Sequence, residues 1–299
     1  MIIDFRYHVV TLVAVFLALG LGILIGANLG KTVNLQFEKQ IDRLELTYQK
    51  IRDDQKLLQA SLQVKENQLE VANQFQNAII PNLISNRLVG KRVAVMITND
   101  SLDFKYAKSL AEILRQAGAE VSSITSLKVL NLTDPQFKTE LVDAFDLPMK
   151  NEKDLLPEID KKILEIIAAG HGAFQLQYLQ NKDLLQIHQG DFNQGPVDAF
   201  IFFGGAMTPE SNHQKELDLP LLEAARKMSG VTLIGVEPSF VTESYMRIYQ
   251  LKCQITVDNI ETAPGKVSLV YLMLSGKKGH YGIKDTAAQG LIPAMKLNY

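Results

Sequence analysis

The first pattern along the chain is an uninterrupted apolar run. Residues 9–29 contain no charged residue and no proline. A run of about 20 apolar residues spans the hydrocarbon core of a bilayer as a helix. The alternative is a cleaved signal peptide, whose apolar region is shorter, about 7–15 residues, and ends at a small-x-small site. Gly26-Ala27-Asn28 is a poor site of that kind. We therefore expect a short tail over residues 1–8, followed by a retained transmembrane helix.

Small residues recur at every fourth position of this run. Residues four apart lie on one face of a helix, and small side chains on that face allow two membrane helices to approach closely. Small residues are also common in membrane helices that do not associate. We interpret the face as a site of helix self-association, formed by Ala14, Ala18, Gly22, Gly26 and Gly30.

Charge leaves the membrane orientation ambiguous. Arg6 precedes the apolar run, whereas Lys31, Lys39 and Arg43 follow it. Counted plainly, these charges would keep the long segment in the cytoplasm, but long domains translocate largely regardless of them. A short N-terminal segment with one arginine is also typical of an uncleaved signal anchor. We expect a cytoplasmic N-terminus, a span in the inner membrane and an extracytoplasmic large domain.

A heptad repeat follows over residues 31–80, which contain neither glycine nor proline, and Pro81 is expected to end the helix. Polar residues such as Gln55 and Lys65 interrupt the apolar seam. A seam of this kind predicts a coiled coil of modest stability and fixed register. The alternative is a helix that packs against the globular part of its own chain. We favour a parallel homodimer, with a core formed by Ile41, Leu44, Tyr48, Ile51, Leu58, Leu62 and Leu69.

Beyond Pro81, apolar runs of strand length alternate with segments of helical spacing. The clearest strands are residues 93–98, 199–203 and 231–236. Buried strands that alternate with helices predict a parallel sheet covered on both faces. We expect a Rossmann-like α/β domain over residues 90–299. Residues 131–190 are mostly helical in pattern and are a candidate insertion.

Composition and motifs exclude several functions. The formal net charge of the 299 residues is −2, and the basic residues are spread along the chain, which argues against a nucleic-acid partner. Cys253 is the only cysteine, so the chain has no internal disulfide or CxxC motif, and we expect a buried structural thiol. GxGxxG, Walker A and GxSxG sequences are absent. We expect no catalytic residues, no cofactor-binding residues and no enzymatic activity.

The sequence offers one weak candidate for ligand binding and none for metal. The five histidines lie far apart and the eight methionines form no MxxM or MxM motif, so no local metal ligands are expected. Parallel α/β sheets bind ligands beyond the carboxyl ends of their strands. The residues at these ends form a candidate ligand edge, made of Asp100, Gly204, Gly205 and Glu237. A glycine pair after a strand is more often only a tight turn.

Two sequence blocks carry a resemblance to a known family. The first is IDFRYHVV at residues 3–10, running into AVFLALG at residues 14–20. The second is TVDNI at residues 256–260 with Gly265, followed by GHYG at residues 279–282. Both blocks resemble the MctB family, called copper transporters after a mycobacterial copper transport protein. The order of anchor, coiled coil and α/β domain matches the whole chain, although the resemblance is weak between residues 131 and 194.

The resemblance implies a role in copper resistance or efflux, with the large domain outside the cytoplasm. It also implies, from other relatives, a role in envelope assembly and division together with a partner protein. The resemblance supplies no catalytic residues, and it is the only reason to consider copper as a ligand. One apolar helix cannot enclose a polar path and holds no ionisable residue to mark an ion route. We therefore expect a non-catalytic, membrane-tethered scaffold or binding protein; the alternatives are a component of copper transport and homeostasis, or an enzyme.

Overall fold

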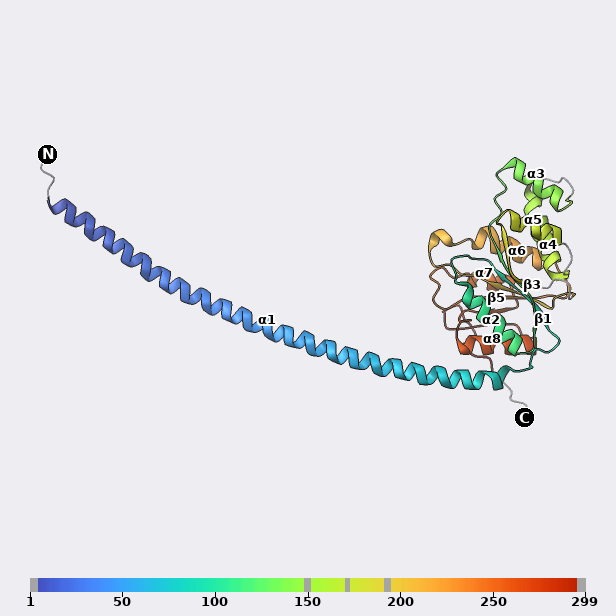
Figure 1. Ribbon diagram of the computed structural model, residues 1–299, viewed down its shortest axis with the longest axis horizontal. Coiled ribbons are helices and arrows are strands. Elements are labelled where there is room, and N and C mark those ends of the chain that lie inside the picture. Colours follow the sequence, from blue (N-terminus) through green and yellow to red (C-terminus); the bar gives the residue numbers. More distant parts are fainter. Residues whose placement is uncertain (1–4, 148–151, 170–172, 191–194, 295–299) are drawn as a thin grey trace. The chain divides into compact units, whose positions relative to one another are not determined.

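The computed structural model describes residues 5–147, 152–169, 173–190 and 195–294 (Figure 1). The chain divides into two compact units, Met1–Asn73 and Gln74–Tyr299. The first unit is helical where it is described. The second unit is the α/β domain.

Helix α1 (Phe5–Ile84) accounts for the described part of the first unit. Its segment Arg6–Ala27 has a mean hydropathy of 2.7 and is the one segment, among the described residues, that is long and apolar enough to span a membrane. The side chains of residues 39–73 are all exposed in the single chain. The apolar helix expected near the N-terminus is confirmed, whereas the pairing of two stalks stays a prediction.

Pro81 does not end α1, and this expectation was wrong. The helix continues through the proline to Ile84. Proline removes a backbone hydrogen bond inside a helix and crowds the preceding turn. Here Ile80 and Ile84, which are 8% and 1% exposed, belong to a hydrophobic cluster of the α/β domain. Burial of these two side chains stabilises the last turn past the proline.

The α/β domain contains a seven-stranded sheet in the order β3-β2-β1-β4-β5-β6-β7. Its strands are β1 (Arg92–Ile97), β2 (Glu120–Leu127), β3 (Leu185–Gly190), β4 (Ala199–Phe203), β5 (Thr232–Val236), β6 (Ile255–Val257) and β7 (Gly279–Tyr281). Neighbouring strands pair in parallel, except that β2 and β3 are antiparallel. The expected α/β fold with a parallel sheet is confirmed, with one antiparallel edge strand added.

Helices cover both faces of this sheet. They are α2 (Phe104–Gln116), α3 (Pro135–Ala144), α4 (Glu152–Ala169), α5 (Ala173–Asn181), α6 (Leu219–Ala225), α7 (Met246–Lys252) and α8 (Ala263–Ser275). Successive residues of a strand point to opposite faces. Met96 and Phe202 therefore enter the cluster with α3 to α7, whereas Val95 and Ile201 enter the cluster with α2 and α8. Figure 1 shows α3, α4 and α5 gathered on one side of the domain, away from α2 and α8.

Residues 131–190 are part of this architecture. They form α3, α4 and α5, as their pattern indicated, but residues 185–190 form β3. Leu141, Ile163 and Leu179 belong to the same hydrophobic cluster as Met96 of β1. The segment is thus a helical excursion that ends in a strand of the sheet, and its description as a helical insertion needs that correction.

Candidate functional site

The carboxyl ends of the parallel strands meet at one edge of the sheet. β1 and β2 lie to one side of the point where the strand order reverses, and β4, β5 and β6 lie to the other side. Open α/β sheets bind ligands at such a switch point. Thr98 follows β1, Gly204 follows β4 and Glu237 follows β5, so the candidate edge residues lie at the carboxyl ends of these strands, while their role as a ligand site stays a prediction.

Side chains of the domain itself fill the space beside Gly204 and Gly205. A Cβ atom at Gly204 would overlap the Tyr249 hydroxyl and lie 2.7 Å from the Tyr245 ring. Gly205 has a φ of +96°, which favours glycine, and a Cβ there would lie 3.0 Å from Val241. Both glycines therefore allow α7 and the loop before it to close over the strand end. They do not line an open anion site in this structure.

A buried carboxyl group occupies the switch point. Asp218 ends a π-helical turn before α6 and is fully buried. Its Oδ1 accepts hydrogen bonds from Thr98 Oγ1 at 2.7 Å and from the Tyr249 hydroxyl at 2.5 Å, whereas its Oδ2 has no partner among the described residues. Burial raises the pKa of Asp218 to about 7. A carboxyl group with a raised pKa is protonated more readily than usual, which agrees with a structural role in a closed crevice.

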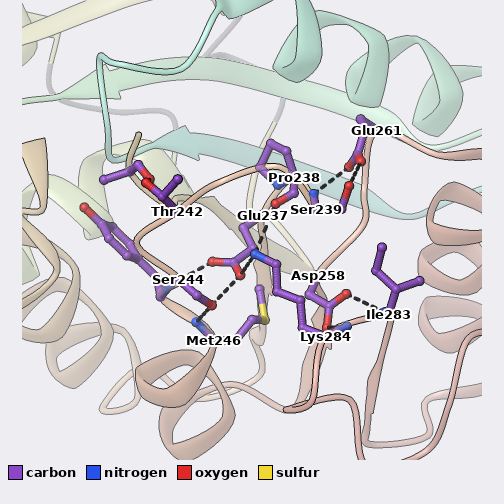
Figure 2. A network of polar contacts seen from close by, with 12 residues as sticks. Glu237, Pro238, Ser239, Thr242, Ser244, Met246, Asp258, Glu261, Ile283 and Lys284 are labelled. Carbon is purple, nitrogen blue, oxygen red and sulfur yellow. Dashed lines mark hydrogen bonds and ion pairs between the residues drawn. The ribbon is translucent and has the colours of Figure 1, made fainter. Parts of the chain in front are cut away.

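Glu237 is saturated by donors of the same chain. Its side chain is fully buried, and Lys284 Nζ lies 2.6 Å from Glu237 Oε1 (Figure 2). Ser244 Oγ and the backbone N–H of Tyr245 donate to the same carboxylate at 2.5 and 2.7 Å. Burial raises the pKa of Glu237, and the charge of Lys284 opposes this rise. A carboxylate held in this way fixes the loop after β5 and has little capacity left for a ligand.

The two blocks of the C-terminal sequence pattern meet beside this ion pair. The strands that carry them, β6 and β7, pair in parallel. Asp258, directly after β6, accepts hydrogen bonds from the backbone N–H groups of Ile283 and Lys284 at 2.7 and 3.2 Å (Figure 2). Gly282 has a φ of +151°, and a Cβ atom there would overlap the Asp258 carboxylate. The pattern therefore positions the loop that delivers Lys284 to Glu237.

Sequence reasoning missed Asp218, Tyr249 and Lys284. Tyr249 is 31 residues from its partner Asp218, and Lys284 is 47 residues from Glu237. No local motif marks residues that meet over such separations. The one available signal was the position of Lys284, two residues after the GHYG block.

One part of the edge is hollow. A cavity of about 340 Å³, hereafter the β1–β2 cavity, lies between the ends of β1 and β2 and the starts of α2 and β3. Asp100 lines it and, within the described part of the chain, has no hydrogen bond and no ion pair within 4 Å, although the charge of Lys128 acts on it from farther away. His188 of β3 lines it as well. The surroundings of Asp100 thus differ from those of Gly204, Gly205 and Glu237. Asp100 lines a cavity, whereas side chains of the domain fill the space beside the other three residues.

Metal-ligating residues are dispersed in the fold. Within the described residues, no group of three or more His, Cys, Asp or Glu side chains is arranged to hold a metal ion. Cys253 follows α7 and is 8% exposed, as expected for a structural thiol. Burial raises the pKa of this thiol, which disfavours the thiolate that binds metals.

The predicted self-association residues all lie on α1. Ala14 and Ala18 are exposed, and no atom lies within 4 Å of a Cβ built on Gly22 or Gly26. Gly30 is helical, but its surroundings lie outside the described residues. The predicted coiled-coil core is exposed throughout, with values for Ile41, Leu44, Tyr48, Ile51, Leu58, Leu62 and Leu69 from 51% to 69%.

A comparison with protein families shows to which family the chain belongs. The profile described as "Copper transport outer membrane protein, MctB" matches residues 2–293. The chain belongs to the MctB family. Relatives named copper transporter MctB occur in Mycobacterium tuberculosis and Mycobacterium bovis, each 25% identical over 94% of this chain and 96% of the relative. The Mycobacterium leprae relative is 23% identical over 97% of this chain and 99% of its own length.

The family and the structure agree on membrane association. The apolar segment of α1 and the family description both indicate it. Among solved structures, MurG of Acinetobacter baumannii is 15% identical, covers 56% of this chain and 40% of its own, and has a TM-score of 0.28. A similarity of this size has no bearing on function.

Proposed function

We propose that this chain is a membrane-tethered, non-catalytic component of copper transport, with its α/β domain as a binding module. The names of the mycobacterial relatives support the copper role. The observation that carries the proposal is the segment Arg6–Ala27, the one candidate span among the described residues. A single apolar helix cannot enclose a polar path for an ion. The chain would then act beside a transport path that other proteins form.

The closed crevice supports a non-catalytic role. Catalysis requires a nucleophile or base within reach of a bound substrate. Tyr245 and Tyr249 occupy the switch point, and Lys284 neutralises Glu237. The acid–base groups at the switch point are therefore committed to the packing of the domain.

We place the span in the inner membrane, with the N-terminus in the cytoplasm and the α/β domain outside it. The family description names an outer membrane protein. Proteins that span outer membranes do so as closed barrels, however, whereas a lone apolar helix suits the inner membrane. Arg6, which precedes the apolar run, is compatible with a cytoplasmic location of that side of the span.

The tether would work as a parallel homodimer. The apolar heptad residues of α1 are exposed in the single chain, and the small-residue face from Ala14 to Gly26 precedes them on the same helix. Parallel stalks would bury these side chains against their own copies. Two α/β domains would then be presented together to a partner protein of copper transport or of envelope assembly.

An exchange of the membrane segment tests the proposal. In cells that lack the gene, copper tolerance is compared after expression of three forms: the full chain, a form with residues 6–27 replaced by an unrelated single-pass helix of the same orientation, and a form that begins at residue 31. We expect the exchanged form to restore tolerance and the unanchored form to fail. Loss of tolerance with a correctly inserted exchanged form would show that the helix itself takes part in transport. A gene without effect on copper tolerance would refute the copper role.

A further inference from the structure

The β1–β2 cavity has the position of a ligand site. It lies at the carboxyl ends of two parallel strands, where open α/β sheets bind ligands. Its volume of about 340 Å³ lies within the range of about 300–1,000 Å³ that is usual for such sites. The neighbouring strand ends are filled by Tyr245, Tyr249 and Lys284. The cavity is therefore where this edge stays accessible.

The inner wall of the cavity is apolar. Ile97 ends β1, Leu127 ends β2 and Leu185 begins β3, and each is at most 5% exposed. On another side, the rings of Phe104 and His188 stack with centroids 4.2 Å apart and an interplanar angle of 17°. The accessible part of this surface, to which the half-buried Phe104 ring contributes most and the three aliphatic side chains contribute little, would contact the aliphatic part of a ligand and would hold it by exclusion of water.

The polar groups of the cavity are mostly hydrogen-bond acceptors. Its lining includes the carboxylates Asp100, Asp103 and Asp183, and Lys128 is its one cationic residue within the described chain. Lys128 Nζ already lies 2.7 Å from Asp183, which leaves little free positive charge. An anionic ligand would thus meet three carboxylates and a cation that is already paired.

Two polar side chains of the lining, Asp100 and His188, keep free hydrogen-bonding capacity. Asp103 caps α2 and pairs with Lys105 at 2.9 Å, whereas Asp100 has no ion pair within 4 Å among the described residues and interacts with the charge of Lys128 only over a longer distance. His188 Nε2 lies 2.7 Å from Ser126 Oγ, and its Nδ1 has no hydrogen bond in the described part of the domain. Burial lowers the pKa of His188, which favours the neutral imidazole, and in the tautomer that donates from Nε2 to Ser126 the Nδ1 atom can accept a hydrogen bond.

We propose that the β1–β2 cavity binds a primary alkylammonium group, with its aliphatic chain against Ile97, Leu127 and Leu185 and its charge at Asp100. The carboxylates alone would not define a site; the cavity and its apolar wall do. The group belongs either to a free amine or to a lysine side chain of a partner protein. This inference rests on the proposed binding role of the domain and specifies the chemistry that the domain recognises.

A titration of the full chain in detergent micelles tests the inference. The protein carries labelled isoleucine and leucine methyl groups, and the probe is n-butylammonium, with butyrate as the matched anion. We expect butylammonium to shift the methyl signals of Ile97 and Leu185 in a saturable manner that weakens with added salt. Butyrate is expected to leave these signals unchanged.

Two variants separate a specific site from general attraction. Asp100→Asn should weaken butylammonium binding by about three- to fivefold, the size of an exposed ion pair. Asp285→Asn, which changes an exposed carboxylate after β7, should have no effect. Equal responses to butyrate and butylammonium, or equal affinities of the two variants, would overturn the inference.

A third arm distinguishes the source of the group. The tripeptide Gly-Lys-Gly is titrated beside butylammonium on the same sample. Tighter binding of the tripeptide would assign the cavity to a lysine of a partner protein, and tighter binding of butylammonium would assign it to a free amine. The membrane-segment exchange does not involve the cavity, so a failed titration leaves the proposed tethering role standing, and the reverse also holds.

Discussion

Replacement of Lys284 by methionine should destabilise the α/β domain strongly. Glu237 is fully buried, and the Lys284 side chain that neutralises it is 18% exposed. Removal of one partner from a buried ion pair typically costs about 3–5 kcal/mol, because the other charge stays buried without compensation. Methionine preserves most of the aliphatic stem, so the loss is electrostatic. Ser244 and the Tyr245 N–H still donate hydrogen bonds to Glu237 in this variant. We therefore expect a cost at the lower end of this range, about 3 kcal/mol.

The effect of Lys284→Met should increase with pH. Burial already raises the pKa of Glu237 above its ordinary value of 4.5, and loss of Lys284 raises it further. A carboxyl group whose pKa is raised in the folded state contributes stability that is present at low pH and is lost as the pH rises through that pKa. We therefore expect the variant to be closer to the unchanged chain at pH 5 than at pH 8.

Thermal unfolding of the detergent-solubilised chain measures this effect. Near-UV circular dichroism of the nine tyrosines can follow unfolding, since the chain has no tryptophan. For a domain of this size, about 3 kcal/mol corresponds to a decrease in Tm of roughly 6–12 °C. The double variant Glu237→Gln with Lys284→Met is the control and should recover part of the loss, since no buried charge remains. A single variant that melts with the unchanged chain at pH 8, or a double variant that melts lower than the single one, would refute the reasoning.

Three further predictions concern the crevice and the stalk. Gly204→Ala should destabilise the domain by about 1–3 kcal/mol in thermal unfolding, because the added methyl group would overlap the Tyr249 hydroxyl. Asp218→Asn should reduce, without abolishing, the loss of stability that the unchanged chain shows in melts as the pH rises from 3.8 to about 7, since burial raises the pKa of this carboxyl over that interval and also raises the pKa of Asp160 and Glu237. Ile51→Asp with Leu58→Asp should render the fragment from residue 31 monomeric in sedimentation while its α/β domain keeps its melting transition; an unchanged fragment that already sediments as a monomer would contradict the dimer.

The strands were predictable where burial is complete on both faces. Residues 200–203 of β4 are all fully buried, so their side chains form a continuous apolar run that the sequence displays directly. β3 lacks this signal, because LQIHQG at the edge of the sheet carries polar side chains at three of its six positions and ends in a glycine. Its place in the sheet depends on pairing with β2, which lies more than 50 residues earlier in the chain, and no local pattern records that pairing.

The sequence indicated which residues would lie at the edge of the sheet, but not whether the edge would be open to a ligand. Asp100 and Glu237 follow β1 and β5, and parallel strands bring such residues to one edge. Whether that edge is open depends on side chains that arrive from elsewhere. Tyr249 closes it over Gly204, and Lys284 reaches Glu237 from a loop after β7. Of the four candidate residues, Asp100 is the one that lines a cavity.

The central claim is that this chain tethers a binding domain to the membrane and does not itself conduct copper. Copper flux into liposomes that contain the purified full chain, with a metal-sensitive dye inside, tests this claim most directly. Empty liposomes and liposomes with the form whose residues 6–27 are exchanged are the controls. We expect all three preparations to take up copper at the same rate. Uptake that rises with the amount of the full chain, and not with the exchanged form, would contradict it.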